Sequence, residues 1–85
     1  MFNINDALYA AQKLGINFDL YTLEEFLDGM NIELEHGLID PLTNVTNDNV
    51  INTAKIALAH LNEYPNYYNR EYGLRVFEEF LKTKL

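Results

Sequence analysis

Cysteine, serine and tryptophan are all missing from this chain of 85 residues. The lack of cysteine excludes a disulfide framework, a thiolate zinc site and a thiol nucleophile. The sequence also contains no nucleophile elbow, phosphate-binding loop, dinucleotide fingerprint or HExxH motif. We therefore predict a protein that is not an enzyme and that needs no cofactor.

Basic residues are scarce, six against thirteen acidic ones, which gives a net charge of −7. A protein that binds the phosphate backbone normally has the opposite balance, so we expect no direct binding to nucleic acid. The first six residues lack the basic start and apolar run of a signal peptide. No apolar stretch is long enough to span a membrane. We expect a cytoplasmic protein without a membrane partner.

Hydrophobic residues make up 48% of the chain, too many for a disordered acidic protein. The length allows one domain, over residues 1–85. Apolar residues recur at helical spacing, and no alternation typical of strands is present. The predicted helices span Asp6–Leu14, Leu23–His36, Asp48–Tyr64 and Asn66–Lys84. We predict an all-α fold, a single compact domain of about four short helices with orthogonal or bundle-like packing.

Residues that favour helix ends lie beside these stretches. Asn5 is a good N-cap for the first helix. Thr22 and Glu25 have the spacing of a capping box at the start of the second. Gly37 is predicted to end that helix. These signals set the expected boundaries without any information from tertiary packing.

The irregular segment between the second and third helices has apolar residues that we expect to attach it to the core, Leu42 and Val45. Either Thr46 or Asn47 caps the third helix. Gly29, inside the second helix, indicates either a close helix crossing or a bend. Each helix has an apolar face expected in the core. These faces comprise Leu8, Ala11 and Leu14; Leu23, Phe26, Leu27, Met30 and Leu34; Val50, Ile51, Ala54, Ala57, Leu58 and Leu61; and Tyr67, Leu74, Phe77, Leu81 and Leu85.

Acidic residues are concentrated in one part of the chain. Seven acids and no base lie from Asp19 to Asp40, which predicts a strong negative potential there. One interpretation is a solvated helix face that keeps a small protein soluble. The other is a binding surface for a basic partner, to which Asp28, Glu35 and Asp40 contribute. Imitation of nucleic acid is a variant of this second interpretation.

Four tyrosines surround Pro65: Tyr64, Tyr67, Tyr68 and Tyr72. Tyrosine-rich patches make good protein interfaces because the rings offer a large area at a low entropy cost. Alternatively, Tyr64 and Tyr67 hold the corner between the third and fourth helices. We expect Tyr68 and Tyr72 to be the exposed pair and include them in the candidate interaction surface.

The spacing of two histidines suggests metal binding as an alternative. Glu33 and His36, and likewise His60 and Glu63, are three residues apart, so each pair shares one side of a helix. Two such helices could present the carboxylates and imidazoles of a zinc, manganese or iron site. Ordinary pairing at helix C-terminal ends, where the dipole favours a protonated imidazole, explains the same residues.

Part of the chain resembles a small family of uncharacterised bacterial and phage proteins, a domain of unknown function. The resemblance is carried by Glu33–Gly37 (ELEHG), Thr43–Asp48 (TNVTND) and Lys55–Tyr68 (KIALAHLNEYPNYY). The family often has a second acid where this chain has Asn49. The resemblance implies no established activity, cofactor or partner.

The function favoured by these observations is a non-catalytic protein-interaction module, and the alternative is a small metal-binding protein. The oligomeric state stays open. Ile32, Ile56 and Val76 fall outside the main apolar faces, so a second copy could cover them in a homodimer.

Overall fold

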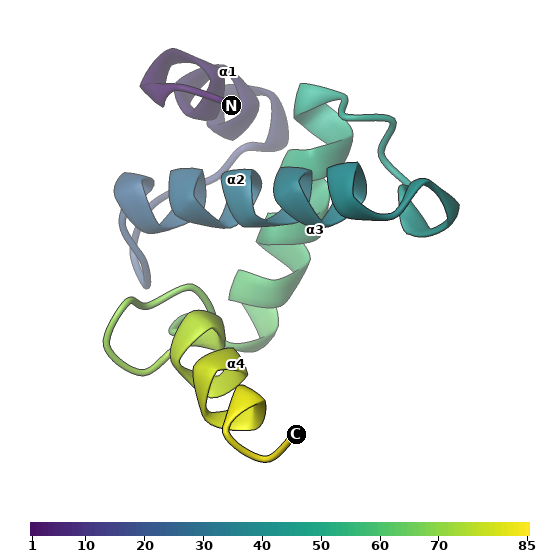
Figure 1. Ribbon diagram of the computed structural model, residues 1–85. Helices are drawn as coiled ribbons and strands as arrows, with labels where there is room; N and C mark the ends of the chain where they lie inside the picture. The colour runs from purple at the N-terminus through teal and green to yellow at the C-terminus, as the bar shows by residue number, and fades with distance from the viewer.

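Four α-helices and one short 3₁₀ turn make up the regular structure of the chain, and no strand is present. The computed structural model describes residues 1–85. In chain order the elements are α1 (Ile4–Leu14), α2 (Leu23–Ile39), η1 (Pro41–Thr43), α3 (Val50–Glu63) and α4 (Leu74–Lys82). The predicted all-α single domain is confirmed (Figure 1). No helix is both long enough and apolar enough to cross a membrane.

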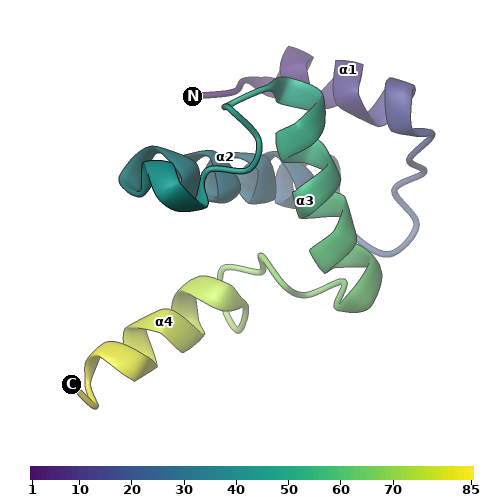
Figure 2. The same ribbon diagram turned by 90° about the vertical axis from the view of Figure 1, so that its right-hand side faces the viewer.

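The first three helices form the body of the protein. In both Figure 1 and Figure 2, α3 runs across α2, and α1 lies beside both. The largest fully buried apolar side chains are Phe26, Met30 and Leu61. Around them the core is made of small residues, because α1 and α3 contribute mainly alanines. The buried apolar residues are Ala7, Ala10, Ala11, Tyr21, Phe26, Met30, Ile32, Ala54, Ala57, Leu61 and Tyr68.

The first helix begins earlier and buries a different face than predicted. Its N-cap is Asn3, whose side chain accepts the Asp6 N–H, while the Asp6 carboxylate accepts the Asn3 N–H. This reciprocal pair replaces the predicted Asn5 cap, because Asn5 lacks an acid at the third helical position. Leu8, expected in the core, is half-exposed.

The second helix starts as predicted and ends later. Thr22 Oγ1 accepts the Glu25 N–H at 3.1 Å and the Glu25 carboxylate accepts the Thr22 N–H at 3.1 Å. The helix continues through Gly37 to Ile39, so the predicted end at Gly37 is wrong. It ends at Asp40, since the residue before a proline is pushed out of the helical region.

The loop before α3 also differs from expectation. Leu42 and Val45 are largely exposed, so they do not attach the loop to the core. The loop is held instead by its own side-chain hydrogen bonds, from Leu42 N–H to Asp40 and from Thr46 N–H to Asn44. The N-cap of α3 is Asn49, which accepts the Asn52 N–H at 3.0 Å, rather than Thr46 or Asn47.

The fourth helix is about half as long as predicted. Residues 64–73 form turns, and α4 begins only at Leu74. Gly73 closes the turns by donating its N–H to the Asn69 carbonyl at 2.8 Å, and Leu74 donates to the Tyr67 carbonyl at 2.6 Å. A Cβ on Gly73 would lie 2.5 Å from backbone atoms of Asn69, so only glycine fits this bend.

Candidate interaction surface

Tyr68 is the residue that attaches the turn segment 64–73 to the body. Its side chain is buried, with 3% of its surface exposed, which contradicts the expectation that it is an exposed interface residue. The ring lies over Gly29 of α2, where a Cβ would come within 2.5 Å of two ring carbons. Gly29 therefore serves a close approach, and the approaching group is an aromatic ring rather than a helix backbone.

The Tyr68 hydroxyl is held between two helices. It donates to Glu33 Oε2 of α2 at 2.6 Å, and His60 Nδ1 of α3 lies 2.8 Å from the same hydroxyl. Because the single hydroxyl proton points at Glu33, we assign the His60 Nδ1 as the protonated nitrogen that donates to Tyr68. Burial is the main cause that raises the pKa of Tyr68 well above its ordinary value, followed by the hydrogen bond and the negative charge of Glu33.

Tyr67, beside Tyr68, covers the outer side of this cluster. Its ring stacks on the His60 imidazole with 4.3 Å between ring centroids. The pKa of Tyr67 is raised first by burial and then by the negative charges of Glu33, Glu78 and Glu63. Tyr67 thus occupies the corner between α3 and the turn segment.

The four predicted metal ligands do not meet at one point. Glu33 contacts both imidazoles, since His60 Nδ1 is 3.3 Å from one carboxylate oxygen and His36 Nδ1 is 3.8 Å from the other. Glu63 is exposed and pairs with none of them. No group of three or more His, Asp or Glu side chains is arranged to hold a metal ion. Tyr68, which was not a predicted ligand, satisfies Glu33 and His60.

A second attachment lies at Arg70. Its Nε and an Nη donate to the two Asp28 carboxylate oxygens at 2.9 and 3.1 Å, in the parallel two-bond geometry that suits arginine and a carboxylate. Asp28, a predicted interface residue, is therefore engaged within the chain. The segment 64–73 is held to α2 by Arg70 and by Tyr68, so the base of α4 has a defined position.

Beyond this base, α4 extends away from the body, as both views show (Figure 2). Leu74 is partly buried against the core, and no α4 residue is fully buried. Phe77 and Phe80 are 57% and 54% exposed, and Val76 and Leu81 are also exposed. We call Val76, Phe77, Phe80 and Leu81 the α4 apolar face. The sequence predicts part of this face as core, and the structure leaves it in solvent.

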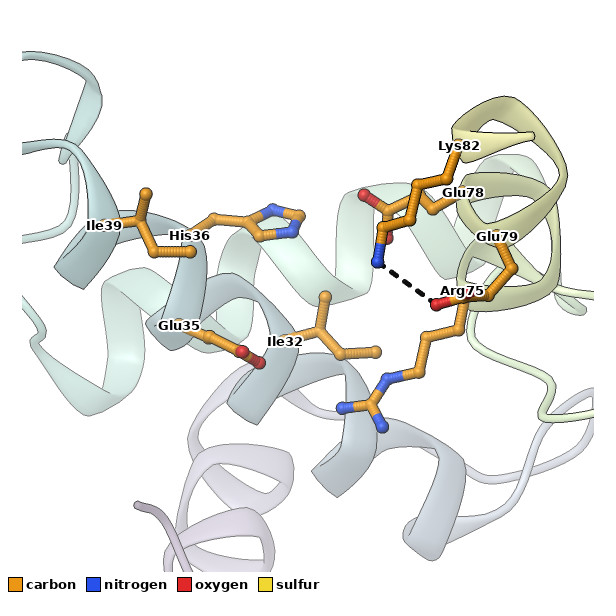
Figure 3. Close-up of a pocket in the computed structure, with 8 residues that line it drawn as sticks. All are labelled: Ile32, Glu35, His36, Ile39, Arg75, Glu78, Glu79 and Lys82. Carbon is orange, nitrogen blue, oxygen red and sulfur yellow. Dashed lines mark hydrogen bonds and ion pairs between the residues drawn. The ribbon is translucent and has the colours of Figure 1, made fainter. Parts of the chain in front are cut away.

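The charged side of α4 is turned toward the body. A cleft of about 390 Å³ separates it from the C-terminal half of α2 (Figure 3). The α4 wall of this cleft carries two bases and two acids, and Lys82 Nζ pairs with Glu79 Oε1 at 3.2 Å. The cleft is lined by Ile32, Glu35, His36, Ile39, Arg75, Glu78, Glu79 and Lys82. The helix is thus oriented opposite to an amphipathic helix that packs on its own core.

A mainly apolar groove of about 580 Å³ adjoins the α4 apolar face at its N-terminal end. Tyr72 on its wall is exposed, as predicted, and Tyr64, predicted to hold the corner, is exposed as well. The groove is lined by Tyr64, Asn66, Tyr67, Tyr72, Gly73, Leu74 and Phe77. Because Phe77 belongs to both, the groove and the face form one continuous surface.

The remaining predicted interface residues are scattered. Glu35 is exposed on α2, and Asp40 is exposed at its end, where it accepts the Leu42 N–H. Three residues were expected to be covered by a second copy. Of these, Ile32 is buried, Ile56 is partly buried, and only Val76 is exposed. The predicted dimer flank does not exist as one surface, because Ile32 belongs to the core.

A protein-family model described as "Protein of unknown function (DUF5661)" matches residues 7–79. The chain belongs to the DUF5661 family. The match confirms the resemblance to a domain family of unknown function, and it includes the Tyr68 attachment and α4 as far as Glu79. No curated protein and no solved structure matches this DUF5661 chain.

Proposed function

We propose that this DUF5661 protein is a non-catalytic protein-interaction module that binds through the α4 apolar face. The observation that carries the proposal is the orientation of α4, which turns charged side chains such as Arg75 and Glu78 toward α2 and its phenylalanines toward solvent. Contiguous exposed apolar surface is typical of interaction sites, whereas scattered exposed apolar residues are not informative.

The attachment of α4 supports this role. Tyr68 and Arg70 hold the segment that leads into α4, so the apolar face is presented from a defined base. A binding surface that is already positioned loses less entropy when a partner binds. The aromatic composition is favourable too, because phenylalanine and tyrosine are enriched in interface cores.

A non-catalytic role agrees with the arrangement of the most reactive groups. The Tyr68 hydroxyl is hydrogen-bonded to both the Glu33 carboxylate and the His60 imidazole, and Tyr68 is buried. Imitation of nucleic acid by the acidic segment is the weaker hypothesis. Several of its acids have internal partners, since Asp28 pairs with Arg70 and Glu25 caps α2.

The test compares three baits in extracts of the source cells. One bait is the unchanged protein, and one carries Phe77→Glu with Phe80→Glu. The control carries Leu38→Glu with Leu42→Glu, which are exposed apolar residues outside the α4 apolar face and its groove. We expect the unchanged and control baits to retain the same partner and the α4 variant to lose it. Retention of every partner by an α4 variant with an unchanged circular-dichroism spectrum would refute the proposal.

A further inference from the structure

We infer that the partner of the α4 apolar face is a second copy of this chain, whose α4 packs antiparallel to form a symmetric dimer. This inference rests on the proposed function, because it uses the same face. It also names what the sequence alone leaves open, namely the surface that forms the dimer and the direction of the paired helices.

The amount of exposed surface is the first argument. The chain exposes 5838 Å², whereas a compact monomer of this mass exposes about 5,200 Å². The excess of roughly 600 Å² approaches the area of about 800 Å² that each partner buries in a stable protein interface. Part of this excess lies on the α4 apolar face and the adjoining groove, which is the surface that a second copy would cover.

The spacing of apolar residues is the second argument. Phe77 and Leu81 of the α4 apolar face are four residues apart. Leu74 precedes Phe77 by three residues, and the part of its side chain that the core leaves uncovered lines the adjoining groove. This is the spacing with which helices pack in pairs. In an antiparallel pair, Leu81 of one copy faces Leu74 of the other and the two Phe77 side chains meet near the symmetry axis. Each copy then uses the same patch, as a two-fold interface requires.

The position of the groove favours the antiparallel direction. The groove lies at the N-terminal end of α4, beside Leu74 and Tyr72. Antiparallel packing brings the C-terminal end of the other α4, with Leu81, over this groove. Parallel packing would set one groove against the other and leave both unfilled.

Charge gives the same direction. Glu71 precedes α4 and Lys84 follows it, and neither forms an ion pair within the chain. Antiparallel packing places Lys84 of each copy near Glu71 of the other, whereas parallel packing places like charges together. Repulsion between acidic bodies is limited, because residues 70–85 contain four bases and three acids.

Sedimentation velocity of the purified full chain over a range of concentrations tests the inference. We expect the unchanged protein and the control Leu42→Glu to sediment as a dimer, with twice the monomer mass of 9.9 kDa. Phe77→Glu, which places a charge at the symmetry axis, should sediment as a monomer, with a dissociation constant raised by about 100-fold or more. Circular dichroism checks that each variant is folded.

A charge exchange tests the direction. Lys84→Glu should weaken the dimer about fivefold or more at low salt, because two surface pairs are lost and two repulsions are added. Combining it with Glu71→Lys should restore the dimer. Failure of the restoration would overturn the antiparallel arrangement.

Two results would overturn the second copy as the partner. One is a monomer at every concentration, and the other is a dimer that Phe77→Glu leaves intact. If the unchanged protein is a monomer while the extract experiment shows a different partner lost with Phe77→Glu and Phe80→Glu, the inference fails and the proposed function stands. If neither experiment depends on α4, both fail.

Discussion

The Tyr68 hydroxyl and the Glu33 carboxylate lie 2.6 Å apart although 35 positions separate them in the chain. With His60, this contact joins α2, α3 and the segment that leads into α4. The position of α4 therefore depends on a hydrogen bond made inside the body.

Replacing Tyr68 by phenylalanine keeps the ring over Gly29 and removes the hydroxyl. Glu33 and His60 then lose their shared partner in a partly buried place, which we expect to destabilise the fold by about 1–3 kcal/mol. The melting temperature of a domain this size falls by about 4–8 °C for each kcal/mol. Urea denaturation followed by circular dichroism measures the change.

The matched control for that variant is Tyr72→Phe. Tyr72 is 62% exposed, and its hydroxyl has no hydrogen-bond partner in the chain. The Tyr72→Phe protein should therefore have the same free energy of unfolding as the unchanged protein. Equal stability of Tyr68→Phe and the unchanged protein would show that the buried hydroxyl contributes nothing.

A methyl group at position 29 should be harmful despite a better helix propensity. Alanine favours a helix interior over glycine by about 1 kcal/mol. Because the new Cβ would lie 2.5 Å from two Tyr68 ring carbons, we expect Gly29→Ala to destabilise the protein by about 1–3 kcal/mol. Thermal unfolding measures the sign of the effect.

The sign should reverse when the ring is removed. In a Tyr68→Val background, the added methyl meets no ring atoms, so Gly29→Ala should stabilise by up to about 1 kcal/mol. Additive effects of the two changes would contradict the close contact between these residues.

Alkaline pH should destabilise the protein. Burial and then Glu33 raise the pKa of Tyr68 above its ordinary value of 10.0, so the folded state holds this proton more tightly than the unfolded state. The contribution of the protonated Tyr68 hydroxyl to the free energy of unfolding is complete below pH 10. It is lost as the pH rises from 10 toward the higher pKa of the folded state. Burial raises the pKa values of Tyr21 and Tyr67 as well, with the same sign.

Urea titrations between about pH 8 and about pH 11 should show this loss, and Tyr68→Phe should show a shallower one. Parallel pH dependence in the two proteins would mean that the Tyr68 hydroxyl is not buried in the folded state.

A chain that ends at Leu74 should still fold. Leu74 is the α4 residue that packs against the core, and no α4 side chain is buried. We expect cooperative thermal unfolding with a midpoint close to that of the monomeric variant Phe77→Glu, because both proteins lack the dimer contact of α4. Loss of cooperativity on truncation would show that α4 packs on the body.

Local signals in the sequence predict much of the fold. The Thr22 and Glu25 capping box, the apolar face of α3 and the placement of both histidines in last turns are all confirmed. Each of these depends on residues within one or two turns of the chain. The third-helix face is wide and regular, so its burial follows from periodicity alone.

The attachment of Tyr68 and the orientation of α4 depend on distant residues and were not predicted. Gly29, a glycine inside a helix, is the one sequence signal for the Tyr68 attachment. The residues around Gly29 do not indicate that a ring 39 positions later fills the space above it. Periodicity shows that α4 has an apolar side without showing which surface covers it. The same pattern therefore predicts a core helix and an exposed one.

The seam between α1 and the rest of the protein is lined by methyl groups. Ala7, Ala10 and Ala11 meet a body whose α3 contributes Ala54 and Ala57. Alanines let backbones approach closely, but each one withdraws only a small apolar area from water. Because burial of apolar surface stabilises a fold by about 25 cal/mol for each Å², each alanine contributes little. Ala7 and Ala10 have no exposed surface, so a larger side chain at either position would require α1 to move away from its neighbouring helices.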